Sequence, residues 1–440
     1  MHAPSGTDTS GRLARVVEVP GAVLLGLGSI LGTGVFVSLG LAAGVAGPAV
    51  VLAVVLAAGV AACNGLSSAQ LAARHPVSGG TYEYGYRELS PTLGFTAGWM
   101  FLLAKSASAA TAALGLAGYL LTGFGFEPTR AAITGLGLVA VVTLTAVVAG
   151  GLGRSNRVNA VMVGVTIAAL LAFVLGAAPA AVGGGAARFT PFLGGGVRDL
   201  LHATALMFVA YTGYGRIATL GEEVRDPRRT IPRAIIATLF VTMLLYVAVV
   251  WVGVGAVDAD GLAEATRASA APLEIVARDL GLPAVAAMVA VGAVTAMVGV
   301  LLNLLLGLSR VLLAMARRGD MPGAFGRIDE TSSSPVRAVV AVGVVVALLA
   351  LTGSVTTTWT FSAFTVLVYY ALTNAAALRL APEHLLFPRW VSWLGLASCL
   401  GLAFWVEPVY WAAGLGLIVL GLGWHGFARS RRNDSARSDH

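Results

Sequence analysis

Two glycine-rich runs interrupt apolar stretches that would otherwise continue as membrane helices. The first covers residues 26–36 and the second covers residues 208–216. A helix broken at mid-membrane frees backbone N–H and C=O groups that hydrocarbon cannot satisfy, but a ligand can. Freed amides at a half-helix N-terminus suit a carboxylate, and freed carbonyls suit an ammonium group or a cation. A zwitterionic amino acid presents both groups, whereas close helix packing by these glycines is an equal alternative.

Few ionisable or strongly polar side chains fall inside the apolar stretches. They include Lys105, His202, Arg216 and Asn303. No carboxylate pair, Cys/His ligand set or phosphate-binding glycine loop accompanies them, so we expect no enzyme, no metal site and no cofactor. The two cysteines, Cys63 and Cys399, also lie in apolar stretches and indicate no disulfide framework.

The composition requires a membrane around these residues. The 440-residue chain is 57% apolar and 11% charged, with a mean hydropathy of +0.85, which the surface of a water-soluble protein could not accommodate. Since about 20 apolar residues cross a bilayer, the turn signals divide the chain into twelve expected spans. These are 20–45, 49–71, 92–122, 131–150, 158–179, 199–220, 234–256, 284–314, 338–352, 356–378, 390–406 and 408–427.

The arginines predict how the chain is oriented. With the N-terminus inside, twenty arginines lie on the cytoplasmic segments and five lie on the opposite face. The positive-inside rule therefore places both termini in the cytoplasm of a multi-pass plasma-membrane protein. The sequence pI of about 9.8 then reflects orientation in the lipid bilayer and not a nucleic-acid partner.

Four motifs in order resemble the amino acid–polyamine–organocation superfamily of permeases, especially its bacterial members similar to cationic amino acid transporters. The motifs are GSILGTGVF at 28–36, PVSGGTYEY at 76–84, EEVRDPRRTIP at 222–232 and SRVLLAMARRGDMP at 309–322. The third motif, with adjacent Glu and Arg residues followed by prolines, is interpreted as a structural or gating segment without substrate contact.

The resemblance implies an all-α membrane protein with a five-plus-five inverted repeat, a leucine-transporter-type fold with discontinuous helices one and six. One transporter domain covers 19–428, with repeats of about 19–180 and 198–380 and two extra helices at about 389–428. Cytoplasmic tails cover 1–18 and 429–440. The implied substrate-binding residues are Ser29, Ile30, Gly32, Thr33, Gly34, Phe208, Ala210, Tyr211 and Gly213. By analogy, the carboxylate meets amides at 32–34, the amine meets carbonyls of both runs, and Phe208 is the outer gate.

The sequence departs from the family at the expected coupling site. Proton-coupled members carry a lysine in span five, where this chain has Thr166. The only lysine is Lys105, in the middle of span three, and a lysine at that depth indicates a protein interior, a partner or a pathway. Our hypothesis is that Lys105 replaces the missing lysine, while attachment to backbone carbonyls is the structural alternative. Asn303 either lines the same cation-like site or forms an interhelical hydrogen bond.

Arg216 is a second departure, because close relatives usually have a small residue at this position. Arginine stays protonated, so it cannot carry the proton. We expect it to pair with Glu222 or Glu223, with a role in selecting acidic substrates as the alternative. His202 is expected to be interfacial.

The sequence therefore predicts a secondary active transporter for amino acids or related amines that works by alternating access and proton symport. Exchange, uniport and a non-transporting amino acid sensor are the alternatives. Small or branched neutral amino acids fit beside Thr33, Ala210 and Gly213, whereas cationic ones fit poorly beside buried positive charge. The oligomeric state is not predicted.

Overall fold

The computed structural model describes residues 18–75, 79–151, 156–218, 224, 226–329 and 334–438, and α-, 3₁₀- and π-helices are the regular elements of these ranges. Eight helices in this part of the chain are long and apolar enough to cross a membrane. They are Gly34–Arg74, Pro91–Gly123, Arg130–Ala149, Arg157–Gly184, Pro227–Ser269, Pro283–Arg317, Val355–Leu378 and Pro408–Ser430. The prediction of an all-helical, multi-pass membrane protein is confirmed.

The first half of the chain folds into seven α-helices and two short turns of other helix types. They are α1 (Val19–Ile30), the π-helical turn η1 (Gly34–Ser38), α2 (Leu39–Ala46), the 3₁₀ turn η2 (Gly47–Ala49), α3 (Val50–Arg74), α4 (Thr81–Glu88), α5 (Pro91–Gly123), α6 (Arg130–Ala149) and α7 (Asn156–Gly184). Local signals explain several boundaries. The Ser90 side chain accepts a hydrogen bond from the Leu93 amide at the start of α5, and Gly47 ends α2 with a φ of 58°.

The second half continues from the 3₁₀ turn η3 (Ala186–Phe189). It contains α8 (Gly196–Tyr211), the 3₁₀ turn η4 (Thr212–Tyr214), α9 (Gly215–Ala218), α10 (Pro227–Ser269), α11 (Pro272–Asp279), α12 (Pro283–Arg317), η5 (Gly323–Gly326), α13 (Val336–Ala350), α14 (Val355–Leu378), η6 (Pro382–His384), α15 (Arg389–Ala403) and α16 (Pro408–Ser438). Proline occupies the first position of α10, α11 and α12, where its missing N–H leaves no helical hydrogen bond unmade.

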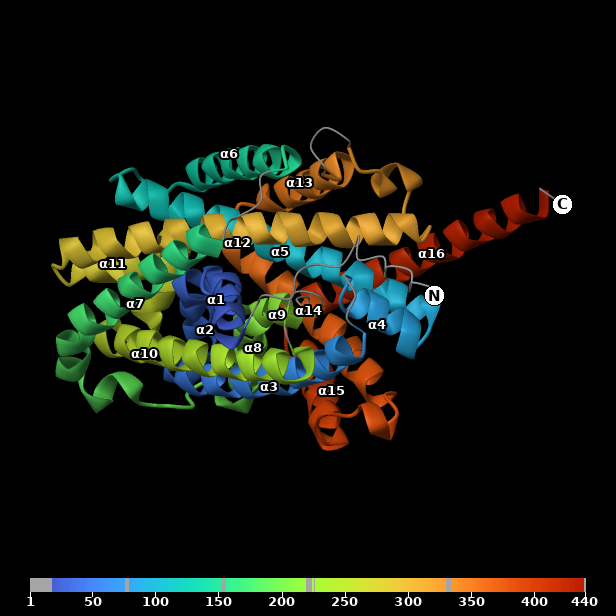
Figure 1. The fold of residues 1–440 in the computed structure, drawn as a ribbon. Coiled ribbons are helices and arrows are strands. Elements are labelled where there is room, and N and C mark those ends of the chain that lie inside the picture. The colour runs from blue at the N-terminus through green and yellow to red at the C-terminus, as the bar shows by residue number, and fades with distance from the viewer. Residues whose placement is uncertain are drawn as a thin grey trace, which may run out of the picture.

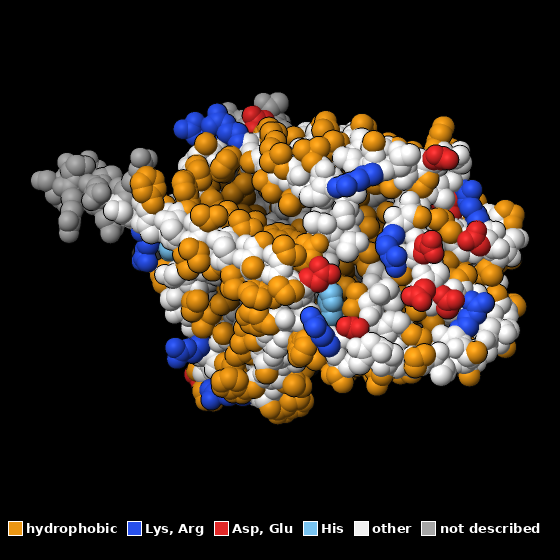
Figure 2. All heavy atoms as spheres, turned by 180° about the vertical axis from the view of Figure 1, so that it is seen from behind, with side chains coloured by type: hydrophobic (Ala, Val, Ile, Leu, Met, Phe, Trp, Pro, Cys, Tyr) orange, Lys and Arg blue, Asp and Glu red, His pale blue; other side chains and the backbone are white. Residues whose placement is uncertain are grey.

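The bundle buries its polar-lined helices and exposes apolar side chains. In the apolar 18-residue window of each long helix, 83% of the window is buried in α5 and 72% in α14, but only 17% in α16. Helices α5 and α14 are therefore central. Helices α1, α2 and α8 also lie inside the bundle, as Figure 1 shows. Apolar side chains cover much of the surface in Figure 2, and most acidic side chains visible there gather in its right-hand half. Such a surface suits lipid contact.

Two segments are more helical than the sequence indicated. Residues 258–281 fall between the expected spans 234–256 and 284–314, a division that would make them a loop, but α10 continues past a backbone turn at Asp258 and α11 follows. The last expected span ends at residue 427, whereas helix α16 continues through the expected tail to Ser438.

Two of the four motifs meet at the end of the bundle that holds α4. The Arg318 guanidinium after α12 donates to both carboxylate oxygens of Glu83 on α4, at 2.6 and 2.7 Å. Tyr82 and Tyr86 donate to Asp320 at 2.7 and 2.5 Å. These bonds connect α4 to the segment after α12, so both motifs have a clear structural role.

Candidate functional site

The first glycine-rich run interrupts the helix as expected. Helix α1 ends at Ile30, Leu31 adopts an extended conformation, and the N–H groups of Val35 and Phe36 both donate to the Gly32 carbonyl. Among the described residues, the N–H groups of Gly32 and Thr33 make no hydrogen bond, and the buried Thr33 Oγ1 has no partner. Three neighbouring donors are therefore free at the start of η1, which suits a carboxylate.

The second run produces a smaller interruption. Helix α8 ends at Tyr211, one 3₁₀ turn follows, and α9 resumes at Gly215. Thr212 Oγ1 donates to the Val209 carbonyl at 2.8 Å, and Tyr370 Oη on α14 donates to the Thr212 carbonyl at 3.2 Å. Side chains therefore satisfy part of the backbone that this turn frees.

The two interruptions contact each other directly. A Cβ atom on Gly213 would collide with the Ser29 carbonyl, and one on Gly34 would lie 2.6 Å from Ala210 Cβ. Tyr246 Oη on α10 lies 3.0 Å from the Ile30 carbonyl oxygen and 3.2 Å from the Ala210 carbonyl oxygen, so its single O–H can donate to either or be shared between them. The structure thus brings the two sets of expected substrate-binding residues together.

Aromatic side chains enclose the α8 side of this junction. Phe208 is fully buried and packs edge to face on Tyr370, with ring centroids 5.5 Å apart. Tyr211 is also fully buried and contacts Tyr246, with a centroid distance of 5.2 Å. The expected gate residue Phe208 is therefore part of a packed aromatic cluster in this conformation.

Lys105 reaches the second interruption from α5. Its Nζ atom donates to Thr212 Oγ1 at 2.7 Å, and the residue is 8% exposed. Within the described ranges, no carboxylate lies within ion-pairing distance of this ammonium group. A hydroxyl, rather than the backbone carbonyls of the structural alternative, is thus the hydrogen-bond partner that the structure gives Lys105.

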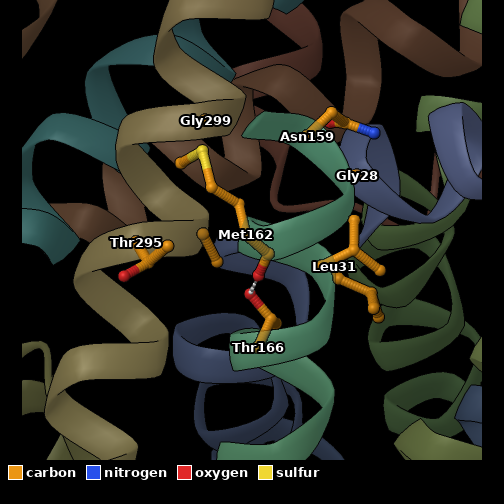
Figure 3. A pocket seen from close by; sticks show the side chains of 9 residues that line it. Gly28, Leu31, Asn159, Met162, Thr166, Thr295 and Gly299 are labelled. Atoms are coloured by element: carbon orange, nitrogen blue, oxygen red, sulfur yellow. Dashed lines mark hydrogen bonds between the residues drawn. The ribbon is translucent and has the colours of Figure 1, made fainter. Parts of the chain in front are cut away.

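Thr166 lies in a separate small pocket between α1, α7 and α12. The lining residues are Gly28, Leu31, Asn159, Met162, Val163, Thr166, Thr295, Ala296 and Gly299. Figure 3 shows Thr166 below Met162, whose carbonyl accepts its hydroxyl proton at 2.8 Å. Neither Lys105 nor Asn303 lines this pocket, so the three expected coupling residues do not form one cluster.

Arg216 is exposed on α9, and its expected partners Glu222 and Glu223 lie outside the described residues.

Sequence reasoning missed Tyr246 and Thr212, which connect the interruptions to α10 and to Lys105. The neighbouring GYG at 213–215 could have drawn attention to Thr212, whereas the apolar surroundings of Tyr246 give no such signal.

Comparison with known proteins identifies the family. A sequence model described as "Amino acid permease" matches residues 21–438. The chain belongs to the amino acid permease family. The permease is 40% identical to an uncharacterized transporter of Mycobacterium tuberculosis, over 98% of this chain and 97% of that one.

Two relatives from Bacillus subtilis have named substrates. The permease is 31% identical to a methylthioribose transporter, over 80% of this chain and 77% of that one. It is also 31% identical to the branched-chain amino acid permease BcaP, over 78% and 76% of the two chains. The predicted resemblance to the permease superfamily is confirmed, and the relatives support a transporter.

Proposed function

We propose that the permease moves amino acids or related amines across the plasma membrane by alternating access, driven by inward proton movement. The observation that carries the proposal is the group of free donors on Gly32 and Thr33, placed directly beside the interruption after α8. A substrate carboxylate would accept from these donors, and its ammonium group would meet carbonyls at the end of α1 and near Phe208 and Tyr211.

We also propose twelve crossings with both termini cytoplasmic. Each set of five crossings would begin with an interrupted helix. In the first set, α1 and α2 together form one crossing, and α3, α5, α6 and α7 form the other four. In the second set, α8 and α9 together form one crossing, and α10, α12, α13 and α14 form the other four. Helices α15 and α16 would lie outside this inverted repeat. The arginine distribution supports the orientation.

Small or branched neutral amino acids are the proposed substrates. Gly34, Ala210 and Gly213 leave little room beside the free donors, and buried Lys105 disfavours an additional cation. The name of BcaP, a branched-chain amino acid permease, is consistent with this choice, whereas the methylthioribose relative makes a sugar thioether the competing substrate.

Uptake by proteoliposomes tests this function. A panel of radiolabelled amino acids and methylthioribose would be offered with and without an inward proton gradient. Gradient-driven uptake of a neutral amino acid is the expected result. Uptake that needs an internal amino acid instead would establish exchange, and binding without counterflow would favour a sensor.

Replacing Thr33 with valine should weaken substrate binding by about ten- to a hundredfold, because a hydrogen bond to a charged group contributes about 1.5–3 kcal/mol. Thr33→Val keeps the size of the side chain but removes the buried hydroxyl that has no partner among the described residues. Equilibrium binding of labelled substrate would measure the loss. Thr33→Ser, which keeps the hydroxyl, is the matched control, and equal binding by both variants would remove Thr33 from the site.

A further inference from the structure

Glu274 is a buried carboxyl group on α11, at the opposite end of the bundle from α4 (Figure 1). The residue is 0% exposed. Its Oε1 atom accepts a hydrogen bond from Arg278 at 2.8 Å, whereas its buried Oε2 atom has no partner among the described residues. A carboxylate with one unsatisfied oxygen is costly to bury, so this environment favours the neutral acid.

Arg278 connects this carboxyl to the end of α5 by hydrogen bonds. The guanidinium of Arg278 also donates to the carbonyls of Thr122 at 2.8 Å and Gly123 at 3.4 Å. A Cβ atom on Gly123 would lie 3.7 Å from Glu274 Oε1, so the carboxyl is in contact with the α5 terminus. The Glu274–Arg278 pair thus joins α11 to the end of α5.

The same contact region connects α11 to the interruption in α1. Tyr119 on α5 lies near Glu274 and donates a hydrogen bond from its hydroxyl to the Phe36 carbonyl at 2.7 Å. Phe36 belongs to η1, which follows Gly32 and Thr33 and packs against α11. Helix α11 therefore covers the segment that begins with the free donors of the candidate site.

Few other titratable groups face Glu274. Helix α11 packs against α5, α7, α10, α12 and η1. The adjoining end of α10 contributes Asp258, Asp260, Glu264 and Arg267, all of which are exposed. The adjoining parts of α7, α12 and η1 contain no titratable side chain. Among the described residues, Arg278 and Tyr119 are therefore the close charged or titratable neighbours.

We propose that Glu274 is an external proton-binding residue, which holds α11 closed over η1 when protonated and releases it when ionised. The external location of Glu274 rests on the proposed orientation of the permease. An acidic exterior would then favour closure of α11 above a bound substrate, so that the proton gradient acts directly on the conformational cycle. This role is separate from the hypothesis for Lys105, which lies at the other interruption.

The direction of the pH effect follows from burial. Burial raises the pKa of Glu274 from its ordinary value of 4.5 to about 7, against the opposing effect of Arg278. Below both values the carboxyl is neutral whether α11 is open or closed, so pH has no effect. Between the two values, the ratio of closed to open forms falls by about tenfold for each unit of rising pH. Above about 7 the ratio is constant.

Thiol labelling of the segment under α11 tests the proposal. Ser38 in η1 is fully buried, so Ser38→Cys in a Cys63→Ala, Cys399→Ala background reports opening to an impermeant maleimide. Labelling would be compared at each external pH with the same protein carrying Glu274→Gln, which mimics the neutral acid and corrects for thiol ionisation. The labelling rate of the protein with Glu274, divided by the rate of the protein with Glu274→Gln, should be near one at pH 4 and exceed ten at pH 7.5. A ratio that does not change with pH would overturn the proposal.

Two further variants keep the test decisive. Glu274→Asp should restore the pH dependence that Glu274→Gln removes. Arg278→Gln removes the charge that favours ionisation, so the midpoint should move to higher pH, and an unmoved midpoint counts against the proposal. Labelling requires neither substrate nor transport. A protein that titrates but fails all uptake assays would therefore contradict the proposed function and leave the role of Glu274 intact.

Discussion

Gly213→Ala should reduce uptake by at least tenfold, although it adds only one methyl group. The added Cβ would collide with the Ser29 carbonyl oxygen and lie 2.5 Å from the Ser29 carbonyl carbon. Because these atoms belong to the backbone, the ends of α1 and η4 would have to move apart, and overpacking of this kind typically costs about 1–3 kcal/mol. The donors of Gly32 and Thr33 would then be displaced from the second interruption. Initial uptake rates, together with the amount of folded protein in detergent, measure the effect.

Gly164→Ala is the matched control for this variant. Gly164 is exposed on α7, and a Cβ atom there would meet nothing within 4 Å. Since alanine is the better helix former, this change should leave uptake unaltered and slightly stabilise the protein. Normal uptake by Gly213→Ala at wild-type substrate affinity would show that close contact between the interruptions is not required.

The role of glycine in the two interruptions could be predicted from the sequence only in part. The run at 26–36 predicts a broken helix, and the structure shows unsatisfied amides at Gly32 and Thr33. The run at 208–216 predicts the same, yet its break is a single 3₁₀ turn whose groups are largely satisfied by neighbours. Gly213 serves close backbone approach instead, which is the packing alternative that the sequence left open.

The contacts of the site could not be predicted, because helices that are apolar on every side carry no signal of which face points inward. Tyr246 and Thr212 lie in such helices and become important only through the packing of α10, α8 and α5. Glu274 was overlooked for a related reason, since an acidic residue in an expected loop is normally exposed. The helical folding of residues 258–281 is what buries it.

Lys105→Gln should abolish uptake driven by a proton gradient, while exchange of substrate at equal pH on both sides continues. Glutamine can still donate a hydrogen bond to Thr212 Oγ1, the partner of Lys105 Nζ, but it cannot bind and release a proton. A buried ammonium group with no carboxylate partner among the described residues is costly, so its proton should be readily released during the cycle. We expect a loss of more than tenfold in gradient-driven accumulation, measured against counterflow in the same vesicles.

Lys105→Arg and Thr212→Val separate proton binding from simple positioning. Arginine keeps a permanent charge, so Lys105→Arg should also lose pH dependence although the positive charge remains. Thr212→Val removes the acceptor but leaves a titratable amine, and should therefore retain pH dependence at lower rates. If Lys105→Gln keeps the full pH dependence of uptake, Lys105 is a structural hydrogen-bond donor to η4, and Glu274 becomes the remaining candidate for the coupled proton.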